Sequence, residues 1–419
     1  MALTGRAALA ALLGAMVVLA AAAFGQAATA LWAFNGLLLA CIVADVALAA
    51  GVRPLRMTRS GDTVVRLGQT ATVTLTIDNP GRRLRGELRD AWPPSACARP
   101  GRVPIEVAGR CQVATTLTPV RRGDRKAAVV TVRSFGPLGL AARQGRHQAP
   151  WTIRVIPPFA SRRHLPEKLA KLRELDGQHR ARRGQGSEFD SLREYVLGDD
   201  VRSIDWRGTA RRGGVVVRTW RAERDRRLLI VLDTGRTSAG RVGDTPRLDC
   251  AMDAALLLAA LASRAGDKVD LIAFDRRIRA RAAGLAAIVS AIAPLEAELI
   301  ESDWRVIVSA APKQRCLLVL LTELNAAAIE EGLLPCLAAL TARHMVVLAA
   351  VADPRTEEMA AGRGDAARVY DAAAAQRARA QRAQVAAALR RVQVVDAPPE
   401  RLPSALADTY LALKAAGRL

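Results

Sequence analysis

Residues 228–240 read LLIVLDTGRTSAG: five apolar residues lead into Asp233, and small and hydroxyl-bearing residues follow it. A strand that is apolar on both faces is typical of the interior of a parallel sheet, because helices cover both of its sides. Further apolar runs follow along the chain, at residues 268–275, 316–323, 345–353 and 392–397.

The segments between these runs have the composition of helices. They predict helices at about residues 247–265, 284–300, 326–342 and 403–416, with an Ala- and Arg-rich helix before the last strand. Strands that alternate regularly with helices form parallel sheets with a helical layer on each side. Residues 228–419 are therefore predicted to form an α/β doubly wound domain.

The carboxyl end of the first strand carries a candidate metal site. In a doubly wound sheet the ligand crevice lies at the carboxyl ends of the strands beside the topological switch point. Asp233 and Thr237 are placed there, and Glu323 would oppose them if residues 316–323 form the neighbouring strand. Oxygen ligands of this kind suit Mg²⁺. The alternative is that Asp233 caps the turn that follows it.

This pattern resembles the metal-ion-dependent adhesion site of von Willebrand A domains, which opens with Asp-x-Ser-x-Ser. The resemblance implies a von Willebrand A-like domain that binds partners at its crevice, where Asp233, Thr237, Asp275 and Glu323 are expected to cluster. Gly235 stands where the first hydroxyl belongs, so the site is degenerate. We therefore expect no cofactor other than weakly bound Mg²⁺, and we expect Gly235→Ser to strengthen its binding.

The beginning of the chain is uncharged from Ala7 to Ala44. As a single helix this stretch would be about 57 Å long, nearly twice the ~30 Å hydrocarbon core of a bilayer. Gly25 and Gln26 interrupt it near the middle. Residues 1–52 are therefore predicted to form a membrane helical hairpin of two transmembrane helices, at about residues 7–24 and 30–50.

The arginines around this hairpin predict its orientation. Arg6 precedes it, Arg53 and Arg56 follow it, and the turn carries no charge, so the positive-inside rule places both outer ends in the cytoplasm. The protein is then a two-pass protein of the inner (cytoplasmic) membrane with its soluble body in the cytoplasm. Asp45 is expected to reach the membrane interface. A cleaved signal peptide remains an alternative for the first segment.

Residues 53–158 alternate apolar and polar side chains with period two. The clearest run is ATVTLTIDNPG at residues 71–81, which predicts a strand that ends in an Asn-Pro-Gly turn. Shorter runs recur between Gly, Pro and Arg-rich turns. This spacing predicts a small β-sandwich.

Residues 159–227 form a charged connector before the α/β domain. It contains SEFDSLREYVLGDDVRSIDWRGTARRG at residues 187–213, in which acidic, basic and aromatic side chains are mixed. Such residues could form an internal ion-pair lattice that fastens the connector to the domain. They could equally form a binding surface, since Arg and aromatic residues make interaction hot spots. The candidate residues are Tyr195, Asp199, Asp200, Arg202, Asp205, Trp206, Arg211 and Arg212.

Followed by an apolar strand that ends in Leu-Asp, this motif is identified as that of the family catalogued as domain of unknown function fifty-eight. The resemblance extends over nearly all of the chain after the hairpin. It implies a partner of MoxR-type AAA+ ATPases, in some cases together with a transglutaminase-like membrane protein, in chaperone-like assembly or cell-envelope processes. We therefore expect a membrane-anchored adaptor or scaffold and not an enzyme.

Two other functions stay open. The first is a metal-dependent hydrolase that uses Asp199, Asp200 and Asp205; the sequence contains no Walker A, H-E-x-x-H, G-x-S-x-G or G-x-G-x-x-G motif. The second is nucleic-acid binding, because the net charge is +22. However, Arg is enriched throughout the chain and aromatic residues make up only 4%, so we expect no specific nucleic acid. The positive charge suits contact with anionic membrane lipid.

Overall fold

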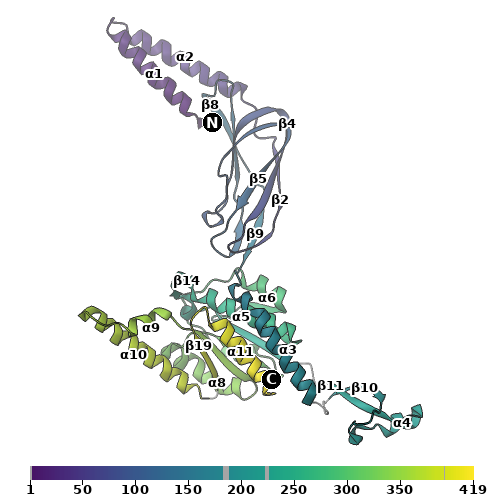
Figure 1. Cartoon of the computed structure of the whole chain (residues 1–419). Helices are drawn as coiled ribbons and strands as arrows, with labels where there is room; N and C mark the ends of the chain where they lie inside the picture. Colours follow the sequence, from purple (N-terminus) through teal and green to yellow (C-terminus); the bar gives the residue numbers. More distant parts are fainter. Residues whose placement is uncertain (1, 183–187, 222–225, 391) are drawn as a thin grey trace. The chain divides into compact units, whose positions relative to one another are not determined.

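The computed structural model describes residues 2–182, 188–221, 226–390 and 392–419. The chain divides into two compact units, Met1–Ile156 and Pro157–Leu419 (Figure 1).

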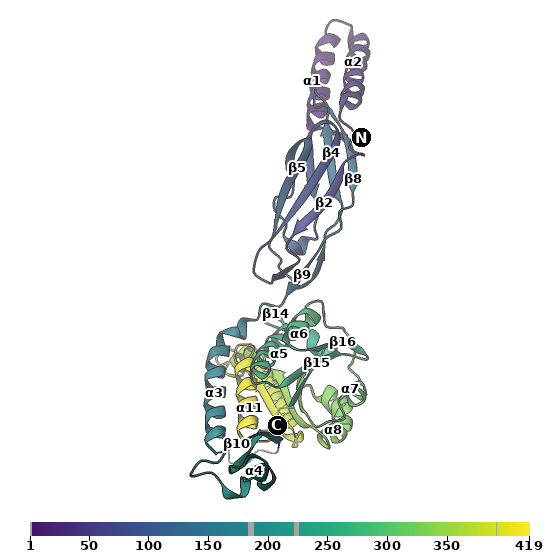
Figure 2. The same ribbon diagram turned by 90° about the vertical axis from the view of Figure 1, so that its right-hand side faces the viewer.

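The first unit begins with two apolar helices that pack side by side, α1 (Gly5–Ala22) and α2 (Ala27–Leu48) (Figures 1 and 2). Both are long and apolar enough to cross a membrane. The turn between them contains Gly25 at φ +74°, as the interruption of the apolar run predicts. Outside the turn most of their large apolar side chains are exposed, as expected for helices that face lipid.

The β-sheets of this unit enclose its core. One sheet has the order β1-β8-β7-β4-β2, with β5 also paired to β4, and the other has the order β3-β9-β6. The strands are β1 (Ala2–Leu3), β2 (Arg56–Gly61), β3 (Val64–Arg66), β4 (Ala71–Asp90), β5 (Val103–Leu117), β6 (Gly123–Lys126), β7 (Val130–Phe135), β8 (Ala141–His147) and β9 (Thr152–Ile156), with a short 3-10 helix, η1, at Pro94–Ala96.

The predicted turn at residues 79–81 is not a chain reversal. Strand β4 continues through it, and the pairing with β5 shifts register between Asn79 and Leu84. The side chain of Asn79 supports this irregularity, because it donates to the carbonyls of Arg82 and Val107 and accepts from the N–H of Gly81. An Asn-Pro-Gly sequence therefore makes a bulge inside one long strand here.

Asp45 lies near the end of α2, where its side chain is buried against the β-domain. Its carboxylate is fully buried and accepts hydrogen bonds from the backbone N–H groups of Leu138, Gly139, Leu140 and Ala141, at 2.7–3.3 Å. On the other side of the hairpin, β1 pairs with β8 just before α1 begins. Both ends of the helical hairpin are therefore fastened to the same loop and strand of the β-domain.

The second unit contains a six-stranded sheet of order β16-β15-β12-β17-β18-β19. Figure 2 labels its strands β15 and β16. The strands are β12 (Arg227–Asp233), β15 (Lys268–Phe274), β16 (Ile278–Ala283), β17 (Leu317–Leu321), β18 (Met345–Val351) and β19 (Gln393–Ala397). Five are parallel, as predicted, but β16 pairs with β15 in antiparallel fashion. β16 is an edge strand in which only Ala282 is buried, and its antiparallel pairing makes the sheet mixed.

Helices cover both faces of this sheet, and the side chains of β12 alternate between them. Leu228, Ile230 and Leu232 join one core cluster, while Leu229 and Val231 join the other. The first face packs against α3 (Leu165–Arg182), α5 (Arg247–Arg264), α6 (Leu285–Ile292) and α11 (Leu402–Ala415). The second packs against α7 (Arg305–Ala310), the π-helix η5 (Ala328–Leu333), α8 (Leu334–Thr341) and the end of α10 (Ala366–Ala388).

The connector is not uniform. Its first part, η2 (Ala160–His164) and α3, packs on the α/β core: Leu172 is buried there, Ser161 bonds Asp253, and buried Lys168 pairs with Asp408. Its second part is an antiparallel hairpin of β10 (Glu188–Glu194) and β11 (Val216–Arg221), with η3 (Val201–Ser203) and α4 (Trp206–Arg212) between the strands.

The remaining elements are small: η4 (Arg236–Ala239), β13 (Arg241–Val242), β14 (Thr245–Pro246) and α9 (Pro354–Ala360). The helix expected over residues 284–300 ends at Ile292, and residues 298–303 form an irregular loop.

Candidate functional site

Asp233 ends β12, whose neighbours on both sides are the parallel strands β15 and β17. This is the topological switch point of the sheet, where ligand crevices form. The side chain is 2% exposed. Its Oδ1 accepts from the Gly235 N–H and the Ser302 hydroxyl, and its Oδ2 accepts from the hydroxyls of Thr237 and Thr322. The capping interpretation of Asp233 is therefore correct, and three hydroxyls add to the cap.

Ser302 takes the place of the hydroxyl that the sequence lacks at position 235. A Cβ on Gly235 would lie 2.2 Å from the Ser302 Oγ and 2.8 Å from the carbonyl oxygen of Ile300. The Ser302 hydroxyl lies 2.5 Å from Asp233 Oδ1. Gly235 is thus required by the close approach of the 298–303 loop, and Gly235→Ser would collide with this loop instead of completing the site as expected.

Backbone hydrogen bonds join the 298–303 loop to the residues that directly follow strands β12 and β15. Glu298 N–H donates to Thr234, Arg236 N–H donates to Ile300, and Asp303 N–H donates to Asp275. Trp304 anchors the end of the loop, because its ring is buried against Phe274 with centroids 4.8 Å apart. The position of Ser302 is therefore fixed by packing.

An open pocket of about 530 Å³ lies in front of Asp233. We call it the Asp233 crevice. Its lining includes charged residues of both signs, three arginines and three carboxylates: Arg236, Arg276, Glu301, Asp303, Arg305 and Glu331. A lining of this kind can complement a polar surface on a partner protein.

The donor set does not fit a strong Mg²⁺ site. Mg²⁺ prefers carboxylate oxygens in nearly ideal octahedral geometry. Here Asp233 contributes the carboxylate, but four protein donors already satisfy its two oxygens. In the described part of the chain, no group of three or more His, Cys, Asp or Glu side chains is arranged to hold a metal ion.

The other two carboxylates expected at this site are engaged elsewhere. Asp275 is buried, caps the turn after β15, and pairs with Arg279 at 2.7 Å. Burial is the largest single influence on Asp275 and opposes its ionisation, but the hydrogen bond and charge of Arg279 and the backbone N–H donors together lower the pKa. Glu323 faces a different pocket, in ion pairs with Arg247 and Arg382. Asp233 and Thr237 therefore meet as predicted, and Asp275 and Glu323 do not join their hydrogen-bonded cluster.

The hairpin of β10 and β11 contains the motif carboxylates, and each has its own partner. Asp199 pairs with Arg193 and accepts from the Val196 N–H. Asp200 caps η3 through the Arg202 N–H. Asp205 caps α4 through the Arg207 and Gly208 N–H groups and pairs with Arg218. These interactions form an internal lattice within the hairpin.

The charge partners also set the protonation of these carboxylates. The guanidinium of Arg193 lowers the pKa of Asp199, and that of Arg218 lowers the pKa of Asp205. Acid–base catalysis near neutral pH favours a carboxyl pKa raised toward 7. The lowered pKa values agree with ionised carboxylates that take part in structural ion pairs.

The other motif residues are on or near the hairpin surface. Trp206 is 66% exposed, and the side chains of Arg202 and Arg211 are exposed as well. Tyr195 directly follows β10 and is half-buried, with its N–H bonded to the carbonyl of Val215. Arg212 lies in α4, and its side chain is outside the described part of the structure. Trp206 is thus a surface residue, and not a core residue that fastens the connector.

Sequence reasoning missed three residues that complete these sites: Ser302, Thr322 and Arg382. Thr322 directly precedes Glu323 at the end of an apolar strand, so its position could have been recognised. Ser302, the partner of Asp233, lies in a loop 69 residues away. Arg382, the partner of Glu323, lies on α10, 59 residues away.

The geometry defines the class of domain: a mainly parallel α/β sheet, covered by helices on both faces, with a buried aspartate at its switch point. Residues 191–397 match the family described as "Protein of unknown function DUF58". The chain belongs to this family, as its motif predicted. The matched segment runs from the hairpin to the last strand of the sheet.

The other comparisons add little. The chain matches no curated protein in sequence. Among solved structures it is similar to the CARDB domain of a Pyrococcus furiosus protein, determined in complex with di-metal ions, with 13% identity and a TM-score of 0.18. That match covers 26% of this chain and 90% of the domain, and its TM-score is too low to support a shared fold.

Proposed function

We propose that this protein is a membrane-anchored adaptor whose von Willebrand A-like α/β domain binds a MoxR-type AAA+ ATPase at the Asp233 crevice. The proposal rests chiefly on Asp233, which is buried at the switch point with hydrogen bonds to both carboxylate oxygens, beside an open pocket lined by charges of both signs. Such a site offers a shaped polar surface to a partner. The ATPase, the possible transglutaminase-like membrane protein and the chaperone-like or cell-envelope role come from the family resemblance.

The Cys316 thiol is the candidate nucleophile that lies next to a histidine, and its burial also supports a binding function over a catalytic one. Cys316 and His344 form a thiol–imidazole pair, with Sγ and Nδ1 3.3 Å apart. Both are buried; burial raises the pKa of the Cys316 thiol to about 12 and lowers the pKa of His344. A buried thiol that keeps its proton is a poor nucleophile.

The membrane part of the proposal rests on the apolar hairpin and its flanking arginines. We propose an inner-membrane location with the second unit in the cytoplasm. Reporter fusions at Leu419 test the side. A cytoplasmic signal is expected, and a periplasmic signal would exclude a cytoplasmic ATPase as the partner.

Binding can be tested with charge reversals on one short helix. Glu331 lines the crevice, whereas its neighbour Glu330 is exposed and does not. In the full chain, reconstituted in nanodiscs, Glu331→Arg should weaken binding of the purified ATPase about tenfold, and Glu330→Arg should leave it within about twofold, because charge complementarity acts at close range. Equal effects of the two variants would show that the crevice is not the interface.

A further inference from the structure

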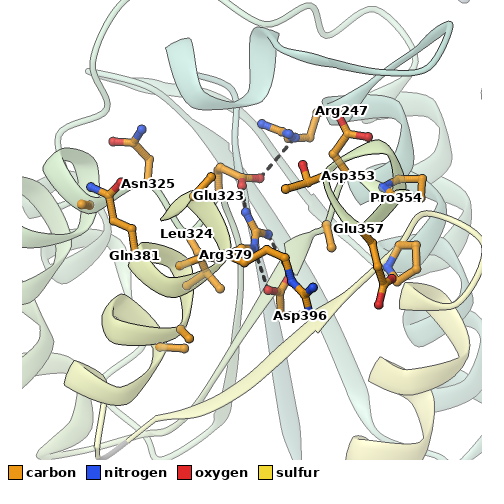
Figure 3. A pocket seen from close by; sticks show the side chains of 18 of the residues that line it. Arg247, Glu323, Leu324, Asn325, Asp353, Pro354, Glu357, Arg379, Gln381 and Asp396 are labelled. Carbon is orange, nitrogen blue, oxygen red and sulfur yellow. Dashed lines mark hydrogen bonds and ion pairs between the residues drawn. The ribbon is translucent and has the colours of Figure 1, made fainter. Parts of the chain in front are cut away.

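A second pocket, which we call the Glu323 pocket, lies at the carboxyl ends of β17, β18 and β19 (Figure 3). Its volume of about 720 Å³ is that of a pocket for a small molecule or a large side chain. Among the described residues, the Glu323 pocket and the Asp233 crevice share one lining residue, Ala327. The two pockets are therefore separate sites.

The floor of the pocket is a buried ion-pair network. Arg382 binds both oxygens of Asp396, at 2.6 and 2.7 Å, and also bonds Glu323 Oε1. Arg247 Nε lies 3.2 Å from Glu323 Oε2. Two arginines thus balance two carboxylates in the floor, which leaves it nearly neutral as a whole.

Two atoms of this network, Glu323 Oε2 and Arg247 Nε, have no hydrogen-bond partner among the described residues. Glu323 is 7% exposed, yet its Oε2 accepts no hydrogen bond from the described residues, and Arg247 Nε donates none. The contact between them is electrostatic only. A buried carboxylate oxygen without a donor is costly, so it favours a ligand that brings an N–H group into the pocket.

The walls of the pocket carry excess negative charge. Figure 3 shows Asp353 and Glu357 on one side of Glu323, and Asn325 and Gln381 on the other. Asp353 caps α9 with Oδ1, and within the described ranges neither Asp353 nor Glu357 is in an ion pair. Exposed Arg379 offsets part of their charge. The pocket is therefore acidic beyond its balanced floor, in a chain with a net charge of +22.

We propose that the Glu323 pocket binds an alkyl-guanidinium group, such as the arginine side chain of a partner protein. The planar guanidinium has five N–H donors, so it can donate to Glu323 Oε2 while its charge is balanced by Asp353 and Glu357. Lysine, with a compact ammonium group, fits this spread of acceptors less well. The site is distinct from the Asp233 crevice, and its ligand does not depend on the identity of the ATPase.

The test uses small probes and the full chain in nanodiscs. Saturation-transfer NMR should detect acetyl-arginine-methylamide, which mimics an arginine in a peptide. Acetyl-citrulline-methylamide has the same shape without the charge and should not bind. Free L-arginine distinguishes a metabolite site from a peptide site: tighter binding than the blocked probe would indicate the free amino acid as the guanidinium source.

Variants then locate the binding. Asp353→Asn with Glu357→Gln keeps the helix cap and should weaken the arginine probe at least fivefold, while the matched control Glu358→Gln, one residue further along α9, should not. Arg379→Gln should leave binding unchanged or strengthen it. The proposal is overturned if the citrulline probe binds as well as the arginine probe, if acetyl-glutamate-methylamide binds instead, or if the double variant binds like the parent.

Discussion

Asp45 and Asp233 are both buried aspartates at the end of an apolar element, but their partners differ. Four backbone N–H groups donate to Asp45, whereas one N–H and three hydroxyls donate to Asp233. A backbone N–H can only donate, while a hydroxyl can also turn and accept. Asp45 is therefore a fixed joint between the helical hairpin and its β-domain. The hydroxyl groups around Asp233 can rotate without movement of the backbone.

Of the substitutions considered, Asp45→Ala should cause the largest loss in the free energy of unfolding. Asp45→Ala removes the acceptor of the Leu138, Leu140 and Ala141 N–H groups, whereas the Gly139 N–H also donates to the Gly136 carbonyl. Each N–H group left unsatisfied costs about 1–3 kcal/mol before relaxation. We expect a loss of about 4 kcal/mol in the free energy of unfolding of the β-domain, together with lower abundance. Thermal unfolding in detergent measures this.

Asp78→Ala is the matched control for that variant, because Asp78 makes a partly exposed ion pair with Arg110 on the same domain. Surface pairs contribute about 0–1 kcal/mol. If Asp45→Ala and Asp78→Ala had the same stability, the carboxylate of Asp45 would not be the joint.

Gly235→Ser should cause the second largest loss in the free energy of unfolding, because the 298–303 loop lies close to Gly235. Gly235→Ser forces the loop, with its Ser302 hydroxyl and Ile300 carbonyl, away from position 235, and overpacking of this kind costs about 1–3 kcal/mol. Adding Ser302→Ala should restore part of the loss, because the contact with Ile300 remains. A double-mutant cycle on the unfolding free energy measures the coupling, and strictly additive effects would contradict the steric explanation.

Gly235 also illustrates what the sequence could predict. The apolar strands could be identified because a parallel sheet buries both of their faces, and β12 and β17 are neighbours as expected. The hydroxyl of Ser302 could not be placed, since residues 298–303 have no periodic pattern and are positioned by tertiary hydrogen bonds and by Trp304. A sequence motif therefore does not reveal a hydrogen-bond partner, such as Ser302, that lies far away in the sequence.

Charge partners were equally hard to predict. Glu323 was expected to face Asp233, because both end neighbouring strands, but the arginines on α5 and α10 draw it into another pocket. Likewise, no pattern in the uncharged run distinguished Asp45 as buried, since its donors come from residues 138–141. Element positions follow from local patterns, whereas the pairing of charges depends on contacts distant in sequence.

The third effect is that of Asp233 itself. Asp233→Ala removes the acceptor of one N–H and three hydroxyls. The Thr237 and Ser302 hydroxyls belong to residues that line the crevice and can rotate toward water, so we expect a loss of only about 1–2 kcal/mol. Chemical denaturation of the full chain measures it against Asp45→Ala. An equal or larger loss at Asp233 would mean that hydroxyl partners do not make this site more adaptable.

The smallest effect should be that of Mg²⁺. For the ion to bind Asp233, at least one of the Ser302, Thr237 and Thr322 hydroxyls must turn its hydrogen away, and Glu323 is held by two arginines and cannot supply a second carboxylate. If the dissociation constant is about 10 mM, then 10 mM Mg²⁺ stabilises the fold by about 0.4 kcal/mol, a shift of roughly 1 °C in Tm. The control is Asp233→Asn at matched ionic strength, which keeps the size of the side chain and should abolish even this shift. Calorimetry that found submillimolar affinity in the parent and none in Asp233→Asn would contradict the prediction, because the hydroxyls would then have rearranged at little cost to form a metal site around a single carboxylate.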